Sequence, residues 1–251
     1  VTDIPALAND PAAKLRTAHA GARVLLVDDN EVNRQITDYL LQSAGLCVAT
    51  ACDGREALDR ARCGEYELVL MDIQMPVMDG LQATSAIRRL PGWETRPIIA
   101  LTANAFAEDR QACKEAGMDD VVTKPVRPGT LYEVLLKWLS AARADGGAPA
   151  GTDAAEAPGM PATAGLLERL AGEAGVDTSR MDAVLGGNAE RYLDLLRNLE
   201  VTARETLHGC GSGPCSCDVE SLRAAAHKLK GSAGNLGVSG IAAGAARIES
   251  A

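Results

Sequence analysis

The chain has 251 residues, of which 47% are hydrophobic and 24% are charged. This length and composition are sufficient for one or two globular domains with apolar cores. The formal net charge of −9 argues against a nucleic-acid partner, because a protein that binds nucleic acid needs a basic face to neutralise phosphates.

Residues 1–21 contain two prolines and no sustained apolar period. We interpret this segment as an N-terminal linker or as the trailing helix of an upstream domain. The first residue is Val1 and not methionine, so we expect the chain to be cut from a longer protein. No apolar run approaches the length of a membrane span and no secretory signal is recognisable, so we expect a cytoplasmic stretch without direct membrane contact.

Residues 22–143 alternate between short apolar runs and helical patterns. The apolar runs lie at residues 24–27, 47–51, 68–71, 98–101 and 121–123. The helical patterns lie at residues 33–43, 55–63, 81–90, 108–116 and 129–142. Runs that are apolar on both faces are typical of buried parallel strands. The alternation therefore predicts an α/β domain with a five-stranded, doubly wound parallel sheet of the flavodoxin-like type.

The second half of the chain has a different pattern. Residues 144–163 are dominated by Gly, Pro, Ala and acidic residues, a composition typical of a flexible linker. Beyond them, helical patterns lie at residues 166–171, 180–185, 189–207, 219–233 and 241–250. Residues 164–251 are therefore predicted to form a second, all-α domain, a helical bundle.

The cysteines fall into two groups. Four lie within the periodic segments: Cys47, Cys52, Cys63 and Cys113. We expect these to be small buried side chains in a reducing compartment. Three others cluster in a stretch rich in Gly, Ser and Pro: Cys210, Cys215 and Cys217. That cluster could hold a metal, but it lacks paired C-x-x-C units, and a surface loop is the favoured interpretation.

Reactive side chains follow the predicted strands at their carboxyl ends. Asp28 and Asp29 follow the first strand, Asp72 the third, Thr102 the fourth and Lys124 the fifth. In a doubly wound sheet these ends converge on one crevice. Three carboxylates there need a counter-charge, and Mg²⁺ suits an oxygen-only site. Asp72 stands alone on the central strand and is the best candidate for a nucleophile in phosphoryl transfer, with Lys124 and Thr102 contacting phosphoryl oxygens.

The strings VDDNEVNR, MDIQMPVMDG, ALTANA and VTKPV resemble the motifs of response-regulator receiver domains. The resemblance covers residues 22–143 and implies that Asp72 is the phosphoacceptor. It implies a Mg²⁺ site in which Asp29 binds directly and Asp28 binds through water. Asp72 and the backbone carbonyl of Gln74 complete the protein ligands.

The same resemblance assigns roles at the last two strands. Thr102 corresponds to the switch hydroxyl of the family, and Lys124 corresponds to the lysine that pairs with the phosphoryl group. The peptide bond before Pro125 is expected to be cis, a state tolerated mainly before proline. Val121 stands where the family usually has Tyr or Phe, whose rotation is coupled to the switch hydroxyl. Whether this chain couples Thr102 to its surface in that way is therefore an open question.

A second candidate site lies in the string AAAHKLKGSAGNLG. His227 falls on a predicted helix, and Lys230, three residues further on, shares its face. A neutral imidazole is a competent nucleophile near neutral pH, and Lys230 can attract phosphoryl oxygens. The string resembles the histidine phosphotransfer (HPt) domain, which implies such a domain over residues 164–251 with His227 as phosphoacceptor. We expect the C-terminal helix of its bundle to be missing.

A receiver followed by an HPt domain resembles the C-terminal part of hybrid sensor histidine kinases. The resemblance implies two-component phosphorelay signalling, from a kinase phosphohistidine to Asp72, then to His227, then to a separate response regulator. The expected partners are an upstream histidine kinase domain, in the same or a partner chain, and that downstream regulator. No ATP-binding signature appears in these residues, so the kinase core and any inner-membrane anchor are expected upstream.

Two other functions are alternatives to this one. The first is a phosphorylation-independent interaction module that gates a kinase or holds a partner protein, for which a complete acidic site would have no use. The second is a phosphatase with an Asp nucleophile on a similar sheet. Such enzymes typically carry an acid two residues after the nucleophile, where this chain has Gln74.

Overall fold

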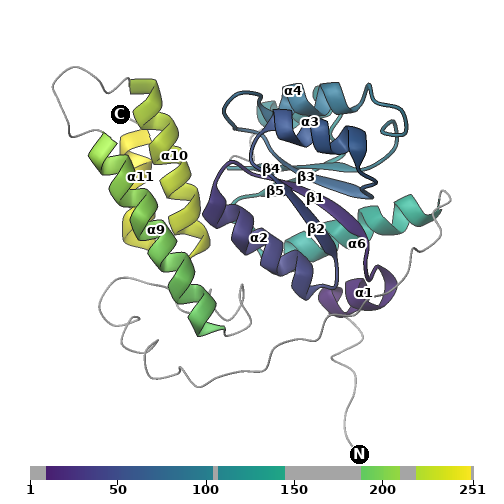
Figure 1. Cartoon of the computed structure of the whole chain (residues 1–251), viewed down its shortest axis with the longest axis horizontal. Helices are drawn as coiled ribbons and strands as arrows, with labels where there is room; N and C mark the ends of the chain where they lie inside the picture. The colour runs from purple at the N-terminus through teal and green to yellow at the C-terminus, as the bar shows by residue number, and fades with distance from the viewer. Residues whose placement is uncertain (1–9, 104–106, 145–187, 210–218, 250–251) are drawn as a thin grey trace, which may run out of the picture. The chain divides into compact units, whose positions relative to one another are not determined.

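The structure is a computed structural model that describes residues 10–103, 107–144, 188–209 and 219–249 (Figure 1). The chain divides into two compact units, Val1–Glu156 and Ala157–Ala251. The predicted helices at 166–171 and 180–185, most of the predicted linker and the cluster of three cysteines lie outside the described residues.

The first unit is built on a five-stranded sheet. Its strands are β1 (Arg23–Val27), β2 (Cys47–Ala51), β3 (Leu68–Asp72), β4 (Ile98–Thr102) and β5 (Asp120–Thr123). Every neighbouring pair is parallel, and the order across the sheet is β2-β1-β3-β4-β5. All residues of β3 and β4 are buried, as expected for central strands covered on both faces. The predicted doubly wound, flavodoxin-like fold is confirmed.

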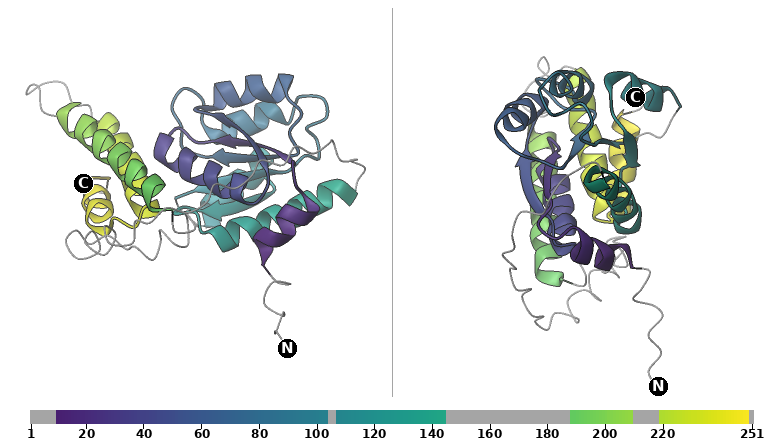
Figure 2. Two further views of the ribbon diagram at one scale, coloured as in Figure 1. Left: turned by 60° about the horizontal axis from the view of Figure 1, so that its bottom comes forward. Right: turned by 90° about the vertical axis from the view of Figure 1, so that its right-hand side faces the viewer.

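Helices cover both faces of this sheet (Figures 1 and 2). They are α2 (Glu31–Ser43), α3 (Gly54–Cys63), α4 (Gly80–Ile87), α5 (Ala107–Ala116) and α6 (Pro128–Ala144). Figure 1 shows α3 and α4 on one face, with α2 and α6 on the other. Three of these helices begin right after a loop at a strand end because an N-cap side chain, Asn30, Asp53 or Asp79, accepts hydrogen bonds from their first turn.

Each tryptophan of the chain lies in this first unit. Trp93 is 2% exposed, belongs to the core formed by β1, β3, β4, α3 and α4, and donates its indole N–H to the carbonyl of Ala61 at 3.1 Å. Trp138 lies on α6 and donates to Oδ2 of Asp120 at 2.9 Å. The two indoles therefore pack with helices on different faces of the sheet.

An N-terminal helix, α1 (Pro11–Ala18), packs against α6. Its side chain Leu15 is fully buried, and Arg16 Nη1 donates to the carbonyl of Ser43, the last residue of α2, at 3.1 Å. His19 follows the helix and is also buried, with Nε2 3.1 Å from Oγ of Ser140 on α6. The part of segment 1–21 that the structure describes is thus a helix docked on the first unit.

The described part of the second unit is helical. It contains α9 (Ala189–Gly209), α10 (Val219–Asn235) and α11 (Ser239–Glu249). Helices α10 and α11 are joined by a tight turn in which Gly237 has φ +75°, a conformation that favours glycine. Tyr192 of α9 is 1% exposed and donates its hydroxyl to the carbonyl of Leu236 at 2.7 Å, which ties α9 to the end of α10. The predicted all-α character is confirmed.

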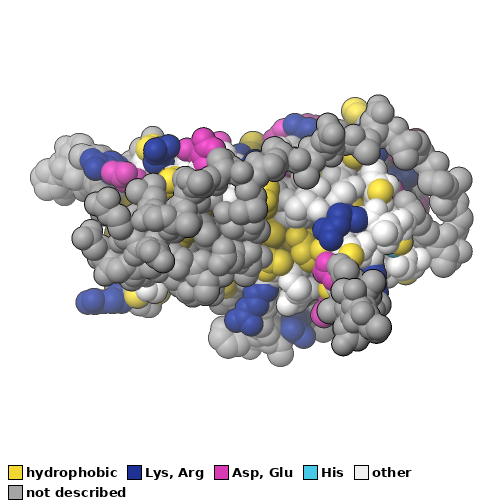
Figure 3. Space-filling model, turned by 90° about the horizontal axis from the view of Figure 1, so that it is seen from below, with side chains coloured by type: hydrophobic (Ala, Val, Ile, Leu, Met, Phe, Trp, Pro, Cys, Tyr) yellow, Lys and Arg dark blue, Asp and Glu magenta, His cyan; other side chains and the backbone are white. Residues whose placement is uncertain are grey.

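Three features of the surface bear on the sequence-based expectations. Among the described residues, no helix has the length and apolarity of a membrane span. In the view of Figure 3, the Lys and Arg side chains of the described residues lie among hydrophobic, acidic and other side chains. Of the cysteines in the described ranges, Cys113 is buried as expected, whereas three are exposed: Cys47, Cys52 and Cys63.

Candidate functional site

Three carboxylates meet at the carboxyl edge of the sheet. Asp28, Asp29 and Asp72 each place an oxygen within 4.8 Å of the others. They come together because β1 and β3 are neighbours in register, with Val27 opposite Met71, so both strands end at the same level. Asp28 is 1% exposed and Asp72 is 6% exposed, so two of the three charges are removed from water.

Lys124 stands between two of these carboxylates. Its Nζ lies 2.7 Å from Oδ2 of Asp28 and 2.6 Å from Oδ2 of Asp72, and the side chain is 8% exposed. Lys124 directly follows β5, its N–H donates to the carbonyl of Thr102 at 2.6 Å, and the peptide bond to Pro125 is cis, as expected. The reactive ends of β1, β3 and β5 are therefore joined in one ion-paired group.

The carboxylates of this group outnumber its single ammonium, and their surroundings shift the pKa values of Asp72 and Lys124. Burial raises the pKa of Asp72 to about 6; Lys124 opposes the rise, and Asp28 and Asp29 add to it. Burial works against the charge of Lys124, but Asp28 and Asp72 hold the pKa of its ammonium above the ordinary value. Three carboxylates facing one ammonium leave excess negative charge in a site whose donors are all oxygens. That donor set fits a hard divalent cation such as Mg²⁺.

The remaining predicted residues surround this group. Thr102 ends β4 opposite Thr123 and is 6% exposed. Gln74 follows β3, and its N–H donates to Oδ1 of Asp72 at 3.4 Å. Val121 lies on β5 and packs against the hydrophobic core on the α3 and α4 face. The position where the family usually has an aromatic ring is thus occupied by a partly buried aliphatic residue.

Two contacts at this site were not foreseen from the sequence. Arg34 of α2 donates from Nη1 to the carbonyl of Asp28 at 2.6 Å, and the N–H of Asn30 donates to Oδ1 of Asp28 at 2.9 Å. A Cβ added to Gly80 would clash with the backbone carbonyl oxygen of Asp72, so only glycine fits there. The first turns of α2 and α4 therefore fix the backbone around both carboxylates.

The second candidate site lies on α10 and α11. Nδ1 of His227 is 2.6 Å from Oε1 of Glu249, and Nζ of Lys230 is 2.8 Å from Oε2 of the same carboxylate. The three side chains are 25%, 38% and 28% exposed for His227, Lys230 and Glu249. Glu249 was missed because it is 22 residues from His227, and no local spacing signals the contact.

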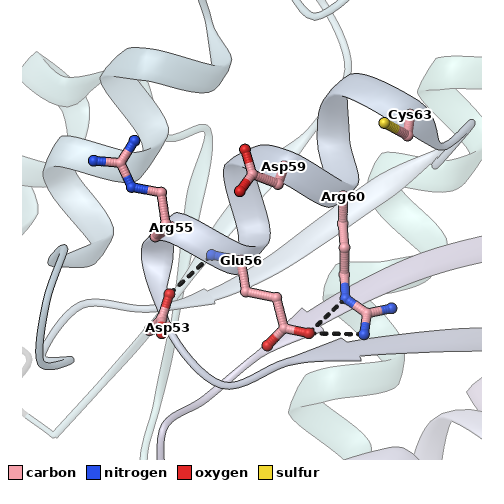
Figure 4. A pocket seen from close by; sticks show the side chains of 6 residues that line it. All are labelled: Asp53, Arg55, Glu56, Asp59, Arg60 and Cys63. Atoms are coloured by element: carbon pink, nitrogen blue, oxygen red, sulfur yellow. Dashed lines mark hydrogen bonds and ion pairs between the residues drawn. The ribbon is translucent and has the colours of Figure 1, made fainter.

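A surface hollow along α3 holds none of these residues (Figure 4). It is lined by Asp53, Arg55, Glu56, Asp59, Arg60 and Cys63. Its charges are largely matched within the helix, because Arg60 pairs with Glu56 at 2.8 Å. The N–H of Cys52 also donates to Glu56 and lowers the pKa of that carboxyl to about 2. We regard this hollow as an ion-paired helix surface.

Comparison with known proteins identifies two families along the chain. Residues 24–136 match the response regulator receiver domain, and residues 165–251 match the Hpt domain. The chain therefore contains a receiver domain followed by an HPt domain, and it belongs to the proteins of two-component phosphorelay signalling.

Its relatives are sensor histidine kinases. Sensor protein GacS of Pseudomonas syringae pv. syringae is 33% identical over 233 residues, which cover 90% of this chain and 24% of GacS. The histidine-protein kinase BarA of Escherichia coli K12 is 38% identical over 115 residues, 46% of this chain and 12% of BarA. The chain thus spans about a quarter or less of these relatives.

A receiver domain of known structure is also similar. It comes from a sensor histidine kinase of Pseudomonas aeruginosa and was crystallised with a magnesium ion coordinated in its active-site cleft. It is 41% identical and covers 48% of this chain and 99% of that structure, with a TM-score of 0.46.

Proposed function

We propose that this chain is the phosphorelay segment of a hybrid sensor histidine kinase. A phosphoryl group passes from a kinase phosphohistidine to Asp72, then to His227, and then to a separate response regulator. The observation that carries the proposal is the group formed by Asp28, Asp29, Asp72 and Lys124. In this group the candidate nucleophile Asp72 lies beside two further carboxylates and one ammonium.

In the first step, an oxygen of Asp72 attacks the phosphorus of the donor phosphohistidine. The new O–P bond forms as the P–N bond to the donor imidazole breaks, and that imidazole leaves with the electron pair. Nζ of Lys124 lies 2.6 Å from Oδ2 of Asp72, close enough to pair with the negatively charged oxygens of the incoming phosphoryl group. Thr102, at the end of the neighbouring strand, supplies a hydroxyl to a phosphoryl oxygen.

Mg²⁺ would be held by Asp28, Asp29, Asp72 and the backbone carbonyl of Gln74. When bound, it supplies positive charge that neutralises the phosphoryl oxygens. The fit to this chain rests on the donor set: carboxylate oxygens within 4.8 Å of one another that one ammonium does not balance.

In the second step, His227 takes the phosphoryl group from Asp72, whose carboxylate is the leaving group. Lys230 is placed to attract phosphoryl oxygens, since it lies on the same helix face as His227. The receiver is proposed to comprise residues 22–143 and the HPt domain residues 164–251. The proposed partners are a histidine kinase domain, which must supply the ATP-dependent step, and a downstream response regulator.

The test is labelling of the full chain with radioactive acetyl phosphate and Mg²⁺. Base hydrolyses an acyl phosphate but leaves phosphohistidine intact, so the two acceptors are separable. We expect base-labile and base-stable label in the parent, base-labile label alone in His227→Gln, and no label in Asp72→Asn. Asp59→Asn, which changes an exposed aspartate of α3, is the matched control and should behave as the parent.

Label in Asp72→Asn equal to that of the parent would remove Asp72 from the pathway. A folded parent chain that binds Mg²⁺ but takes no label from either acetyl phosphate or a phosphorylated kinase domain would instead support the interaction module.

A further inference from the structure

Asp28 is held through its backbone and through both oxygens of its carboxylate. Its N–H donates to the carbonyl of Ala51 on β2 at 3.2 Å, and its Oδ1 accepts from the N–H of Asn30 at 2.9 Å. Its Oδ2 lies 2.7 Å from Nζ of Lys124, and its carbonyl accepts from Nη1 of Arg34 at 2.6 Å. Neither the backbone nor the carboxylate of Asp28 can therefore turn without the loss of one of these contacts.

Arg34 reaches this carbonyl from the first turn of α2. The backbone N–H of Arg34 donates to the carbonyl of Asn30, the N-cap residue of the helix, at 2.9 Å. Side chains of a helix lean toward its N-terminus, so the long side chain of Arg34 extends back to the end of β1. The guanidinium is always charged, and a charged donor makes a shorter and stronger hydrogen bond than a neutral one. The start of α2 thus holds the residue that ends the first strand.

The neighbouring carboxylates do not use the charge of this guanidinium. In the part of the chain that the structure describes, Arg34 enters no ion pair, although three carboxylates gather at the adjacent strand ends. The positive charge that pairs with Asp28 and Asp72 comes from Lys124. The contact that Arg34 makes is therefore a hold on the backbone and not a balance of charge.

The carbonyl that Arg34 holds belongs to the peptide bond between two of the carboxylate residues. Asp28 and Asp29 are consecutive, and the peptide unit that joins them is planar. Fixing the direction of the Asp28 carbonyl also fixes the direction of the Asp29 N–H, because both lie in that plane. One hydrogen bond from α2 therefore constrains how both carboxylate residues leave the backbone.

We propose that Arg34 is a positioning residue for the divalent cation, which fixes the peptide plane between Asp28 and Asp29 and thereby raises the affinity of the acidic site for Mg²⁺. This inference rests on the metal site of the proposed function. In this role Arg34 contacts neither the cation nor the phosphoryl group. Without its hold on the carbonyl, the two carboxylates must be ordered when the cation binds, and that entropic cost weakens the affinity.

The charge of Arg34 taken alone predicts the opposite sign. A guanidinium close to a cation site repels the cation, so a variant that lost only this charge would bind Mg²⁺ more tightly. A merely structural contact between α2 and β1 predicts a third result, in which the folded variant is less stable but binds Mg²⁺ as the parent does. The affinity for the cation therefore separates the three roles.

The experiment measures cation binding to the full chain. Free Mn²⁺, which prefers the same oxygen donors, is counted by electron paramagnetic resonance, and Mg²⁺ is added as the competitor. Arg34→Met removes the donor and should weaken Mg²⁺ binding roughly 10- to 100-fold, as when a partner that orients a metal ligand is lost. Arg34→Lys keeps a charged donor without the planar fork and should lie between the two. Arg62→Met, at an exposed ion pair on α3, is the matched control.

Phosphorylation supplies the second readout. The rate at which acetyl phosphate labels Asp72 should need a correspondingly higher Mg²⁺ concentration for half its maximum in Arg34→Met. The rate should reach the parent maximum when Mg²⁺ saturates the site, because Arg34 acts through the cation. If circular dichroism shows that Arg34→Met does not fold, a smaller shift in the same direction is expected in Arg34→Lys.

Two results would overturn the proposal. One is Mg²⁺ binding by the folded variant that is equal to or tighter than that of the parent. The other is a lower maximal rate at an unchanged half-saturating Mg²⁺ concentration, which would mean that Arg34 contacts the phosphoryl group. A parent chain that binds Mg²⁺ but takes no label would instead overturn the proposed function of Asp72, while the effect of Arg34 on Mg²⁺ affinity would still be measured.

Discussion

The receiver unit and the helical unit each hold one candidate phosphoacceptor, and the two are built differently. Asp72 is 6% exposed and sits among two more carboxylates and a buried ammonium brought from three strand ends. The side chain of His227 is 25% exposed and has one carboxylate from one neighbouring helix. An anionic nucleophile needs its charge balanced once it is buried, whereas a neutral imidazole needs only its tautomer fixed.

The largest expected effect tests this contrast with two lysines. Lys124→Met leaves Asp28 and Asp72 buried without a counter-charge and should reduce the free energy of unfolding by about 3–5 kcal/mol. Lys230→Met removes a lysine that is 38% exposed and should cost less than about 1 kcal/mol. Urea unfolding at neutral pH in metal-free buffer, followed by circular dichroism, measures both. Equal losses would mean that the two sites do not differ in burial as described.

The next effect concerns pH. Burial raises the pKa of Asp72 from 3.8 to about 6, so the folded chain keeps a proton that the unfolded chain has already released. The stability that Asp72 contributes is therefore complete below about pH 4 and is lost as the pH rises through about 6. Without metal, we expect the free energy of unfolding to fall by ~2 kcal/mol across this window.

The control for this pH effect is Asp72→Asn, which has no carboxyl to titrate. Denaturant titrations at several pH values should give a flatter curve for the variant than for the parent. Parallel curves would show that burial does not raise the pKa of Asp72 in the folded chain.

The smallest expected effect is the change in stability on replacing either of two glycines, one in each unit, with alanine. A methyl group on Gly80 would clash with the backbone carbonyl of Asp72, so Gly80→Ala should cost roughly 1 kcal/mol or more and displace the acceptor strand. On α11, no described atom lies within 4 Å of a Cβ at Gly244, so Gly244→Ala should stabilise the helical unit by about 0.5–1 kcal/mol. Thermal unfolding of both variants beside the parent measures the pair, and stabilisation by both would contradict the packing around Gly80.

The sequence predicted the sheet closely because buried parallel strands carry a local signal. The runs at 68–71 and 98–101 differ by one residue from β3 and β4. The helix expected at 81–90 ends earlier, at Ile87. There Arg88 donates to the carbonyl of Trp93, five residues further on, and to the carbonyl of Gly117, which is brought near by the fold and not by the local sequence.

The residues of the candidate sites also fall into those that a local sequence signal predicts and those that depend on tertiary contacts. The acidic residues and Lys124 were predictable because each follows a strand, and parallel strands end at one edge. The contact between Glu249 and His227 was not predictable, because it depends on how α11 is rotated against α10. The docking of α1 was also missed, because it depends on contacts with α6, which is more than 100 residues away in the sequence.

The positions of the tryptophans provide an intrinsic fluorescence probe of one unit of the chain. The sequence has two tryptophans, and both lie in the receiver unit. Trp93 is enclosed by α3 and α4, and Trp138 sits on α6 beside Asp120. Indole emission therefore reports on both faces of the receiver sheet, whereas the helical unit contributes no tryptophan fluorescence. Unfolding followed by fluorescence and by circular dichroism would separate the two units in the intact chain, without any attached dye.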